Sequence, residues 1–288
     1  METVSINRDA IIAKISKTLV TAGSTFRPDQ IEAYRSAIEK ETESRAKWVL
    51  SQLLENALTA ETHCSPLCDD TGIPHIFLEI GRDQIISAEL FECIQLGIKQ
   101  GLDRLPGRSM AVRGNEIERL EQSQGLFEEP SALEPAPICL RIVPESIIRV
   151  TILMLGGGPA IRGITHRIFH KHSHQIIIDE IVDRAKQAVS KLGCSPCTLA
   201  IGIGRSQFEA TSLMIEAMAK GNYSEQSEFE KEITRQVNNA HIGPLCLGGS
   251  SSVLATFAKI GPQRASGVRI VALRPCCCFE PRRASVVL

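Results

Sequence analysis

Pro66-Leu67-Cys68-Asp69-Asp70-Thr71-Gly72 places a cysteine directly before two carboxylates, and an apolar run from Ile73 to Ile80 follows it. The run has strand character, so the Cys-Asp-Asp triplet is predicted to lie on a loop that leads into a strand. Reactive side chains are often aimed from loops that a rigid element holds in place. We therefore take this stretch as the centre of both the fold and the candidate site.

Two distant cysteine segments have similar surroundings. Cys194 lies in Gly193-Cys194-Ser195-Pro196, and Cys276-Cys277-Cys278 lies near the C-terminus. Each segment adjoins loop residues at a junction between predicted elements, which suits convergence on one site. Three thiolates from three loops can hold an iron–sulfur cluster and leave one iron without a protein ligand. The pattern alone does not select the ligands, because Cys64 and Cys197 lie four and three residues from these candidates.

Composition excludes several classes of function. The chain has 288 residues, a net charge of −1 at pH 7 and 4% aromatic residues, which argues against nucleic-acid and polybasic membrane surfaces. No apolar run is long enough to span a bilayer. Because Met1-Glu2-Thr3-Val4 lacks the regions of a signal peptide, we expect a cytoplasmic protein. The 10 cysteines would stay reduced there, which favours metal or cluster ligation over disulfides.

Hydrophobic periodicity predicts an α+β fold. We expect a single mixed domain over residues 1–288, with a small β-sheet surrounded by helices and the cluster loops converging on one face. Strands are predicted over 73–80, 138–143, 147–155, 198–203 and 268–273. Helices are predicted over 6–22, 25–60, 87–105, 176–191, 206–220, 224–238 and 253–259, and a solvated loop over 116–137.

Several single residues are open to both structural and functional interpretations. Trp48, Cys93 and Cys139 are interpreted as core residues because of their apolar surroundings. His166, His170, His172 and His174 form a dense group that could suggest a metal site. We favour an exposed basic loop between a strand and a helix for this group.

The cysteine segments resemble those of the class I (iron–sulfur) fumarase and L-tartrate dehydratase family. Residues 66–72 resemble its P-x-C-Q-D-T-G segment, and 193–196 its C-P-P segment. Residues 242–249 match its I-G-P-x-x-L-G-G segment, and 278–283 its C-x-x-x-R-R segment. The segments occur in the family's order across nearly the whole chain. The chain looks like the separate alpha subunit of two-subunit members, which corresponds to the N-terminal domain of the fused fumarases.

The resemblance implies a 4Fe-4S cluster and names its ligands. Cys68, Cys194 and Cys278 would hold it as metal and cofactor ligands, with Cys276 or Cys277 as alternatives to Cys278. The iron without a protein ligand would act as a Lewis acid on a small dicarboxylate substrate. The resemblance also implies a beta subunit that completes the active site and supplies the base for the carbon proton. Homo-oligomerisation is expected as well.

Other residues match the family's substrate site. Asp70 is implied as a catalytic proton-transfer group, although an Asx-turn role is the structural alternative. Arg108, Gly157 and Gly158 are implied in substrate binding, as is Asp69. Asp69 stands where the family usually has glutamine, and it would place an extra negative charge before a dianionic substrate.

The implied activity is reversible hydration of fumarate to malate by the alpha subunit of an iron–sulfur hydro-lyase. The first alternative is the alpha subunit of an L-tartrate dehydratase. An alternative of another class is a non-catalytic cluster-binding or structural paralogue. The Asp69 departure favours this paralogue, and so does Ser266, which occupies the position of a family histidine 12 residues before Cys278.

Overall fold

The computed structural model describes residues 7–288, which form two compact units. The first unit contains the residues up to Thr25, together with Ala60–Leu155 and Arg282–Leu288. The second contains Phe26–Thr59 and Gly156–Pro281, so the chain passes between the units four times. The single domain over residues 1–288 stays a prediction.

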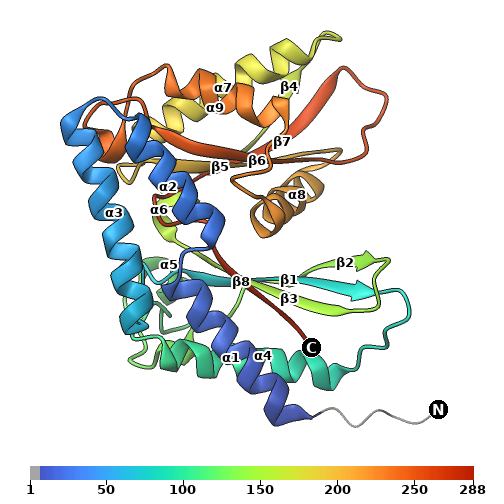
Figure 1. The fold of residues 1–288 in the computed structure, drawn as a ribbon. Helices are drawn as coiled ribbons and strands as arrows, with labels where there is room; N and C mark the ends of the chain where they lie inside the picture. The colour runs from blue at the N-terminus through green and yellow to red at the C-terminus, as the bar shows by residue number, and fades with distance from the viewer. Residues whose placement is uncertain (1–6) are drawn as a thin grey trace. The chain divides into compact units, whose positions relative to one another are not determined.

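The first unit is a four-stranded sheet of order β2-β1-β3-β8 with two helices packed on it (Figure 1). Its strands are β1 (Ile73–Gly81), β2 (Cys139–Val143), β3 (Ile148–Leu155) and β8 (Arg282–Val287). β1 pairs parallel with β2, and the other two pairings are antiparallel. The strands β1 and β3 share an apolar core with the helices α1 (Arg8–Ser24) and α4 (Ala88–Arg104).

Glycine lets the two helices approach each other closely. A Cβ atom on Gly97 of α4 would lie 2.5 Å from the Ile15 Cβ of α1, and one on Gly101 would lie 2.8 Å from the Leu19 Cβ. A larger residue at either position would push the helices apart and open the core beneath them.

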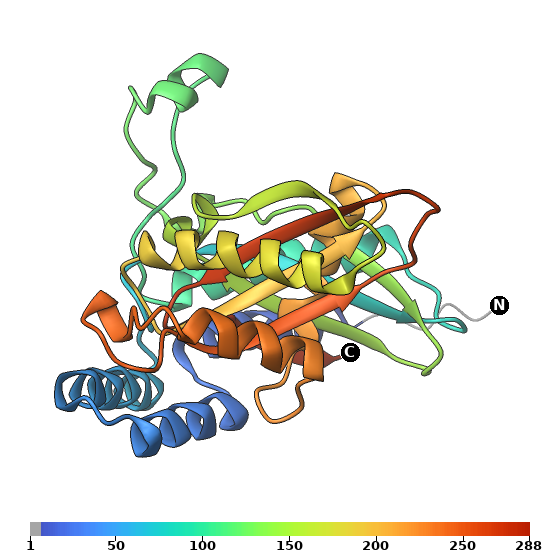
Figure 2. The ribbon, with the colours of Figure 1, turned by 90° about the horizontal axis from the view of Figure 1, so that it is seen from above.

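A hairpin with the short helix α5 (Glu116–Glu121) at its tip extends between α4 and β2 (Figure 2). Its two arms are joined by a bridge between Val112 and Leu126. The helix begins with a capping box, in which the Asn115 side chain accepts from the Glu118 N–H and the Glu118 carboxylate accepts from the Asn115 N–H. A short 3-10 helix, Pro130–Ala132, follows the hairpin.

The second unit has a four-stranded sheet of order β4-β7-β5-β6. Its strands are β4 (Ile164–Phe169), β5 (Cys197–Gly204), β6 (Val253–Ile260) and β7 (Val268–Cys276). Helices α7 (His174–Ser190) and α9 (Glu228–Asn238) lie on one face and α8 (Gln207–Lys220) on the other (Figure 1). Every residue of β5 is buried, as expected of a strand covered on both faces.

Three further helices complete the chain. α2 (Pro28–Lys40) belongs to the second unit, and α3 (Ser44–His63) begins there and ends in the first. α6 (Gly157–Ala160) is a single turn at the start of the long second stretch of that unit, and the 3-10 turn Pro244–Cys246 precedes β6.

The α+β class is confirmed, and most predicted elements form within a few residues of their expected bounds. Residues 253–259 were predicted to be helical, but they form strand β6, and the predicted long helix over 25–60 is two helices. Strands β4 and β8 were not predicted, and the strands form two sheets in place of one. Met1–Val4 and Ile6, used in the sequence analysis, lie outside the described residues.

Burial tests the predicted core residues. Cys93 is fully buried, as predicted, but Trp48 is 62% exposed and Cys139 is half-buried, so those two predictions are wrong. Within residues 7–288, none of the helices combines the length and the apolar character needed to cross a bilayer.

Candidate functional site

The Cys68 loop lies in the first unit, between the end of α3 and the start of β1. Cys68 is half-buried and Asp69 is exposed. Leu67 is buried, and its N–H donates to the Gly23 carbonyl at the end of α1, 2.9 Å away. The loop is therefore attached to the core directly before the cysteine, as the sequence predicts for a site presented by a rigid element.

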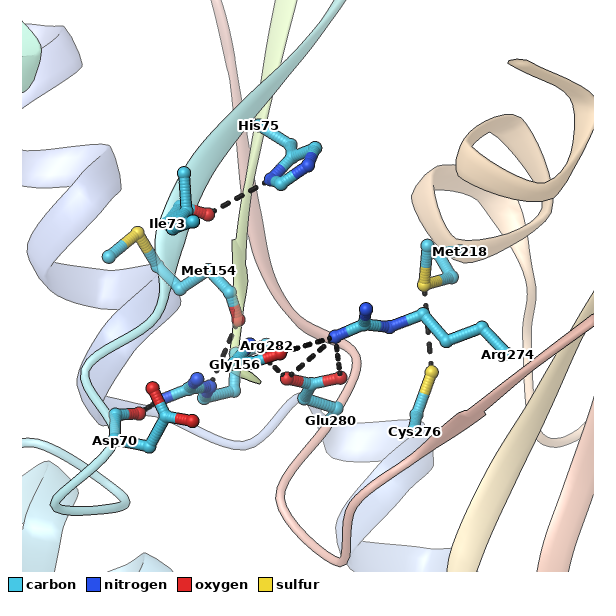
Figure 3. Close-up of polar contacts among 10 residues, drawn as sticks. All are labelled: Asp70, Ile73, His75, Met154, Gly156, Met218, Arg274, Cys276, Glu280 and Arg282. Atoms are coloured by element: carbon cyan, nitrogen blue, oxygen red, sulfur yellow. Dashed lines mark hydrogen bonds and ion pairs between the residues drawn. The ribbon is translucent and has the colours of Figure 1, made fainter. Parts of the chain in front are cut away.

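The buried side chain of Arg282 attaches the same loop from its other end (Figure 3). Its Nη1 donates to the Asp70 carbonyl at 2.7 Å, and its Nε donates to the Met154 carbonyl at 3.0 Å. Gly72 leaves room for the guanidinium, because a Cβ atom there would lie 2.7 Å from Arg282 Nη2, and its φ of +86° suits glycine. The peptide of Asp70 is thus fixed beside the end of β3.

Asp69 and Arg108, both predicted to bind substrate, are close together. Arg108 Nη1 lies 3.3 Å from Asp69 Oδ2, and the two side chains are 57% and 83% exposed. Gly107 permits this approach of the two loops, since a Cβ atom on it would overlap the Thr71 side chain. Such an exposed pair adds little stability, but the Asp69 charge offsets part of the charge that Arg108 could offer to a substrate carboxylate.

Two of the three predicted cluster ligands lie in the second unit and are joined through their backbones. The Cys278 N–H donates to the Cys194 carbonyl at 2.8 Å. Cys194 is exposed and Cys278 is buried. The buried Tyr34 hydroxyl donates to the Cys278 carbonyl at 2.5 Å. Burial, with the neighbouring Cys278, raises the pKa of Tyr34, so this donor keeps its proton.

Cys276 differs from the other two cysteines of the C-terminal run. Cys276 is fully buried at the end of β7, and its Sγ contacts Met218 Sδ of α8 at 3.5 Å (Figure 3). Burial raises the pKa of the Cys276 thiol well above its ordinary value. Its side chain therefore belongs to the core of the unit, whereas Cys277 and Cys278 lie on the turn that follows.

The glycine-rich loop is held by a buried ion pair. Glu280 is fully buried, and its carboxylate lies 3.0 Å from Arg274 Nη2. The Glu280 carboxylate also accepts from the Gly156 N–H, while Arg274 Nη2 donates to the Gly156 carbonyl at 3.0 Å (Figure 3). Gly157 and Gly158 follow and are exposed, and a Cβ atom on Gly158 would meet no described atom within 4 Å. This pair connects the Cys278 turn to the start of the predicted substrate loop.

The exposed loop that we favoured for the histidine group forms only in part: His172 is exposed on the loop between β4 and α7. His166 lies on β4, and His170 is 6% exposed with its ring bonded to the Ser266 carbonyl at 2.8 Å. Burial, together with the nearby Arg184 charge, lowers the pKa of His166 to about 4. Across residues 7–288, no group of three or more His, Cys, Asp or Glu side chains is arranged to hold a metal ion.

Four buried residues of these networks were not predicted from the sequence: Tyr34, Arg274, Glu280 and Arg282. Glu280 and Arg282 lie in the C-x-x-x-R-R segment and could have been noticed there. Arg274 could have been noticed as a charge inside the apolar run of β7. A charged residue in a buried strand needs a partner, and Glu280 was the nearest acid in the sequence.

Comparison with known proteins gives consistent results. The sequence profile described as fumarate hydratase (Fumerase) matches residues 12–287. A Methanocaldococcus jannaschii protein named "Putative L(+)-tartrate dehydratase subunit alpha" is 26% identical over 266 residues, which cover 86% of this chain and 88% of that protein. The L(+)-tartrate dehydratase subunit alpha of Escherichia coli K12 is 20% identical over 272 residues, covering 92% and 86%.

These matches define the chain as a hydro-lyase. It belongs to the fumarate hydratase (Fumerase) family, whose members are iron–sulfur enzymes.

Proposed function

We propose that this chain is the alpha subunit of an iron–sulfur hydro-lyase that dehydrates a 2-hydroxydicarboxylate, with L(+)-tartrate as the first candidate substrate. The observation that carries the proposal is the family match over residues 12–287. The names of the two relatives described above favour L(+)-tartrate and imply a second subunit. Malate and fumarate are the second candidate pair, because the family itself is described as fumarate hydratase.

The donor set fits an iron–sulfur cluster. We propose Cys68, Cys194 and Cys278 as its ligands, because thiolates are the donors that such clusters use. The hydrogen bond between Cys278 and Cys194 supports the assignment of these two residues, since it keeps their loops together. The contact of Cys276 with Met218 supports Cys278 over Cys276 as the third ligand.

When bound, the cluster supplies Lewis-acid chemistry that stabilises the charge on a departing hydroxyl group. We assign the remaining tasks to residues of this chain. Asp70, whose peptide Arg282 holds, would exchange a proton with the substrate. Arg108 would bind one substrate carboxylate, and the exposed backbone at Gly157 and Gly158 would approach the substrate closely. The base for the carbon proton is assigned to the beta subunit.

The ligand assignment is tested by iron and sulfide content after anaerobic purification. We expect Cys68→Ser, Cys194→Ser and Cys278→Ser to lose most of the cluster iron and its absorbance, because each removes one thiolate ligand. Cys93→Ser and Cys276→Ala are matched controls and should keep the parent's content, since both thiols are fully buried and the Cys276 Sγ contacts Met218. Equal iron content in Cys194→Ser and Cys93→Ser would contradict the assignment.

The activity is tested with the full chain, alone and with a beta subunit of the same family. We expect no turnover by the chain alone and turnover of L(+)-tartrate by the mixture, followed as formation of the dehydrated product. A higher kcat/KM for malate or fumarate would make the second substrate pair the correct one. A full cluster content with no turnover of any of these acids by the mixture would support the non-catalytic paralogue.

A further inference from the structure

The I-G-P-x-x-L-G-G segment, Ile242–Gly249, has no role in the chemistry proposed above, yet its backbone is unusual. From residue 241 to 249, six residues have positive φ, and three of them, His241, Leu245 and Cys246, are not glycine. Such conformations persist where the surrounding structure holds them in place. Gly243 cannot be replaced, because a Cβ atom would overlap the Gly248 carbonyl. The segment is therefore a tight turn with a fixed shape.

Ser195, the residue after Cys194, is fully buried against this turn. Its hydroxyl donates to the Gly243 carbonyl at 2.6 Å and accepts from the Cys246 N–H at 3.2 Å. Its carbonyl accepts from the Leu245 N–H at 2.9 Å. Three hydrogen bonds thus join one residue of the Cys194 loop to the turn.

The turn is itself attached to the rest of the second unit. The fully buried Ser252 hydroxyl accepts from the Gly243 N–H at 3.0 Å, and the Asn238 side chain of α9 accepts from the Ser252 N–H at 3.0 Å. The Glu41 carboxylate accepts from the Ser250 and Ser251 N–H groups at 2.9 and 3.3 Å. The turn is consequently anchored at both ends and can hold a neighbouring loop in place.

The other side of the Cys194 loop contacts the Cys278 turn, through the hydrogen bond between the Cys278 N–H and the Cys194 carbonyl. Cys194 itself is exposed, and Gly193 before it has a φ of +79°. The Cys194 residue is thus held by two segments. The Cys278 N–H bonds its carbonyl directly, and the Ile242–Gly249 turn bonds the next residue, Ser195.

We propose that Ser195 is a positioning residue, which locks the Cys194 loop onto the Ile242–Gly249 turn so that the Cys194 thiolate is held in a ligating position. The inference rests on the proposed role of Cys194 as a cluster ligand. It also explains a departure from the family pattern, because the serine takes the place of the first proline of C-P-P. A proline could form neither of the two hydroxyl bonds.

Ser195→Ala tests the proposal. The substitution removes the hydroxyl partner of the buried Gly243 carbonyl and of the Cys246 N–H, which keeps only its bond to the Gly243 carbonyl at 3.2 Å. We expect the anaerobically reconstituted chain to transfer cluster iron to a chelator about tenfold faster than the parent. In the chain without cluster, hydrogen exchange of the Leu245, Cys246 and Cys278 amides should also become faster. The spectrum of the reduced cluster in Ser195→Ala should also differ from that of the parent.

Thr256→Val is the matched control. Thr256 is also fully buried, and its hydroxyl bonds the Thr234 hydroxyl at 2.9 Å, away from the Cys194 loop. Thr256→Val should lower the melting temperature and leave the rate of iron transfer and the hydrogen exchange of the Cys278 amide unchanged. If Ser195→Ala does not fold, Ser252→Ala weakens the same turn one step further from Cys194, and a smaller effect in the same direction is expected.

The outcomes separate this proposal from the proposed function. Iron transfer at the parent's rate in Ser195→Ala, or an equal acceleration in Thr256→Val, would overturn the positioning role. If the parent binds no cluster, the proposed function fails, and the exchange measurement decides alone. An unchanged Cys278 amide in Ser195→Ala would then overturn the link between the turn and the loop.

Discussion

At the scale of single residues, Asp69 is the departure from the family pattern with the clearest electrostatic consequence. Its carboxylate lies 3.3 Å from Arg108, which we propose as a substrate-binding residue. A substrate carboxylate that approaches Arg108 must compete with this fixed negative charge. Because both side chains are largely exposed, water and salt weaken the competition without abolishing it.

Asp69→Gln should therefore improve substrate binding. We expect KM for the dicarboxylate to fall about threefold to tenfold when the chain is assayed with its beta subunit at low ionic strength, because Arg108 loses its competing partner. The gain should shrink as salt is added. Glu145→Gln, a change at another exposed acid, is the control. An unchanged or higher KM in Asp69→Gln would show that Arg108 does not meet the substrate.

At the scale of elements, Arg282 connects three parts of the first unit. It begins β8, and it bonds the carbonyls of Asp70 in the loop and Met154 in β3. Arg282→Ala should lower the free energy of unfolding by about 3 kcal/mol, since the buried Met154 carbonyl and the part-buried Asp70 carbonyl lose a charged donor.

The measurement is urea denaturation of the full chain, with Arg264→Ala as a control at an exposed arginine. The control should change the unfolding free energy by less than about 0.5 kcal/mol. A loss of that small size in Arg282→Ala would mean that the Asp70 loop is held by other contacts.

The sequence predicted those elements whose periodicity is long and regular, such as α4, α7 and β3. It failed for β6, where Val253–Ile260 is a short apolar run that suits a buried strand as well as a helix. β4 was missed because His166 and Arg167 interrupt its apolar residues. Trp48 was placed in the core by its apolar neighbours in the sequence, but its position on α3 leaves it exposed.

The candidate site could be predicted only in part, because local sequence patterns do not report contacts between distant residues. Motif spacing is the basis on which Cys194, Cys278 and Asp70 are proposed, because those residues occur in recognisable local patterns. The contacts around these segments join residues far apart in the sequence: Ser195 bonds Gly243, 48 positions away, and Glu280 bonds Gly156, 124 positions away. Pairings of that range depend on the folded chain, and neither a motif nor a periodicity in the sequence reports them.

At the scale of the whole molecule, acid should destabilise the fold through His166. Its folded pKa is lowered to about 4 from an ordinary 6.5, mainly by burial and also by Arg184. Below pH 6.5, His166 therefore binds a proton in the unfolded chain but stays neutral in the folded chain until the pH approaches 4. The stability that the neutral ring contributes is complete above pH 6.5, and it is lost progressively as the pH falls towards 4.

His166→Gln should remove this loss, which we expect to be on the order of 2 kcal/mol. The check is the difference in unfolding free energy between pH 7 and pH 4.5, measured by urea denaturation. His172→Gln, at an exposed histidine, should keep the parent's pH dependence. The same acid loss in His166→Gln and the parent would rule out His166 as its source.

The position of β8 in the chain has a consequence for how the protein is made. β8 is an edge strand of the first unit's sheet, beside β3, yet it is translated after every residue of the second unit. On the ribosome, the second unit can complete its own sheet before β8 is available to pair with β3 in the first unit. Arg282 arrives with β8, so the loop that carries Asp70, already bonded to Gly23 through Leu67, gains this second anchor only after the second unit has been translated.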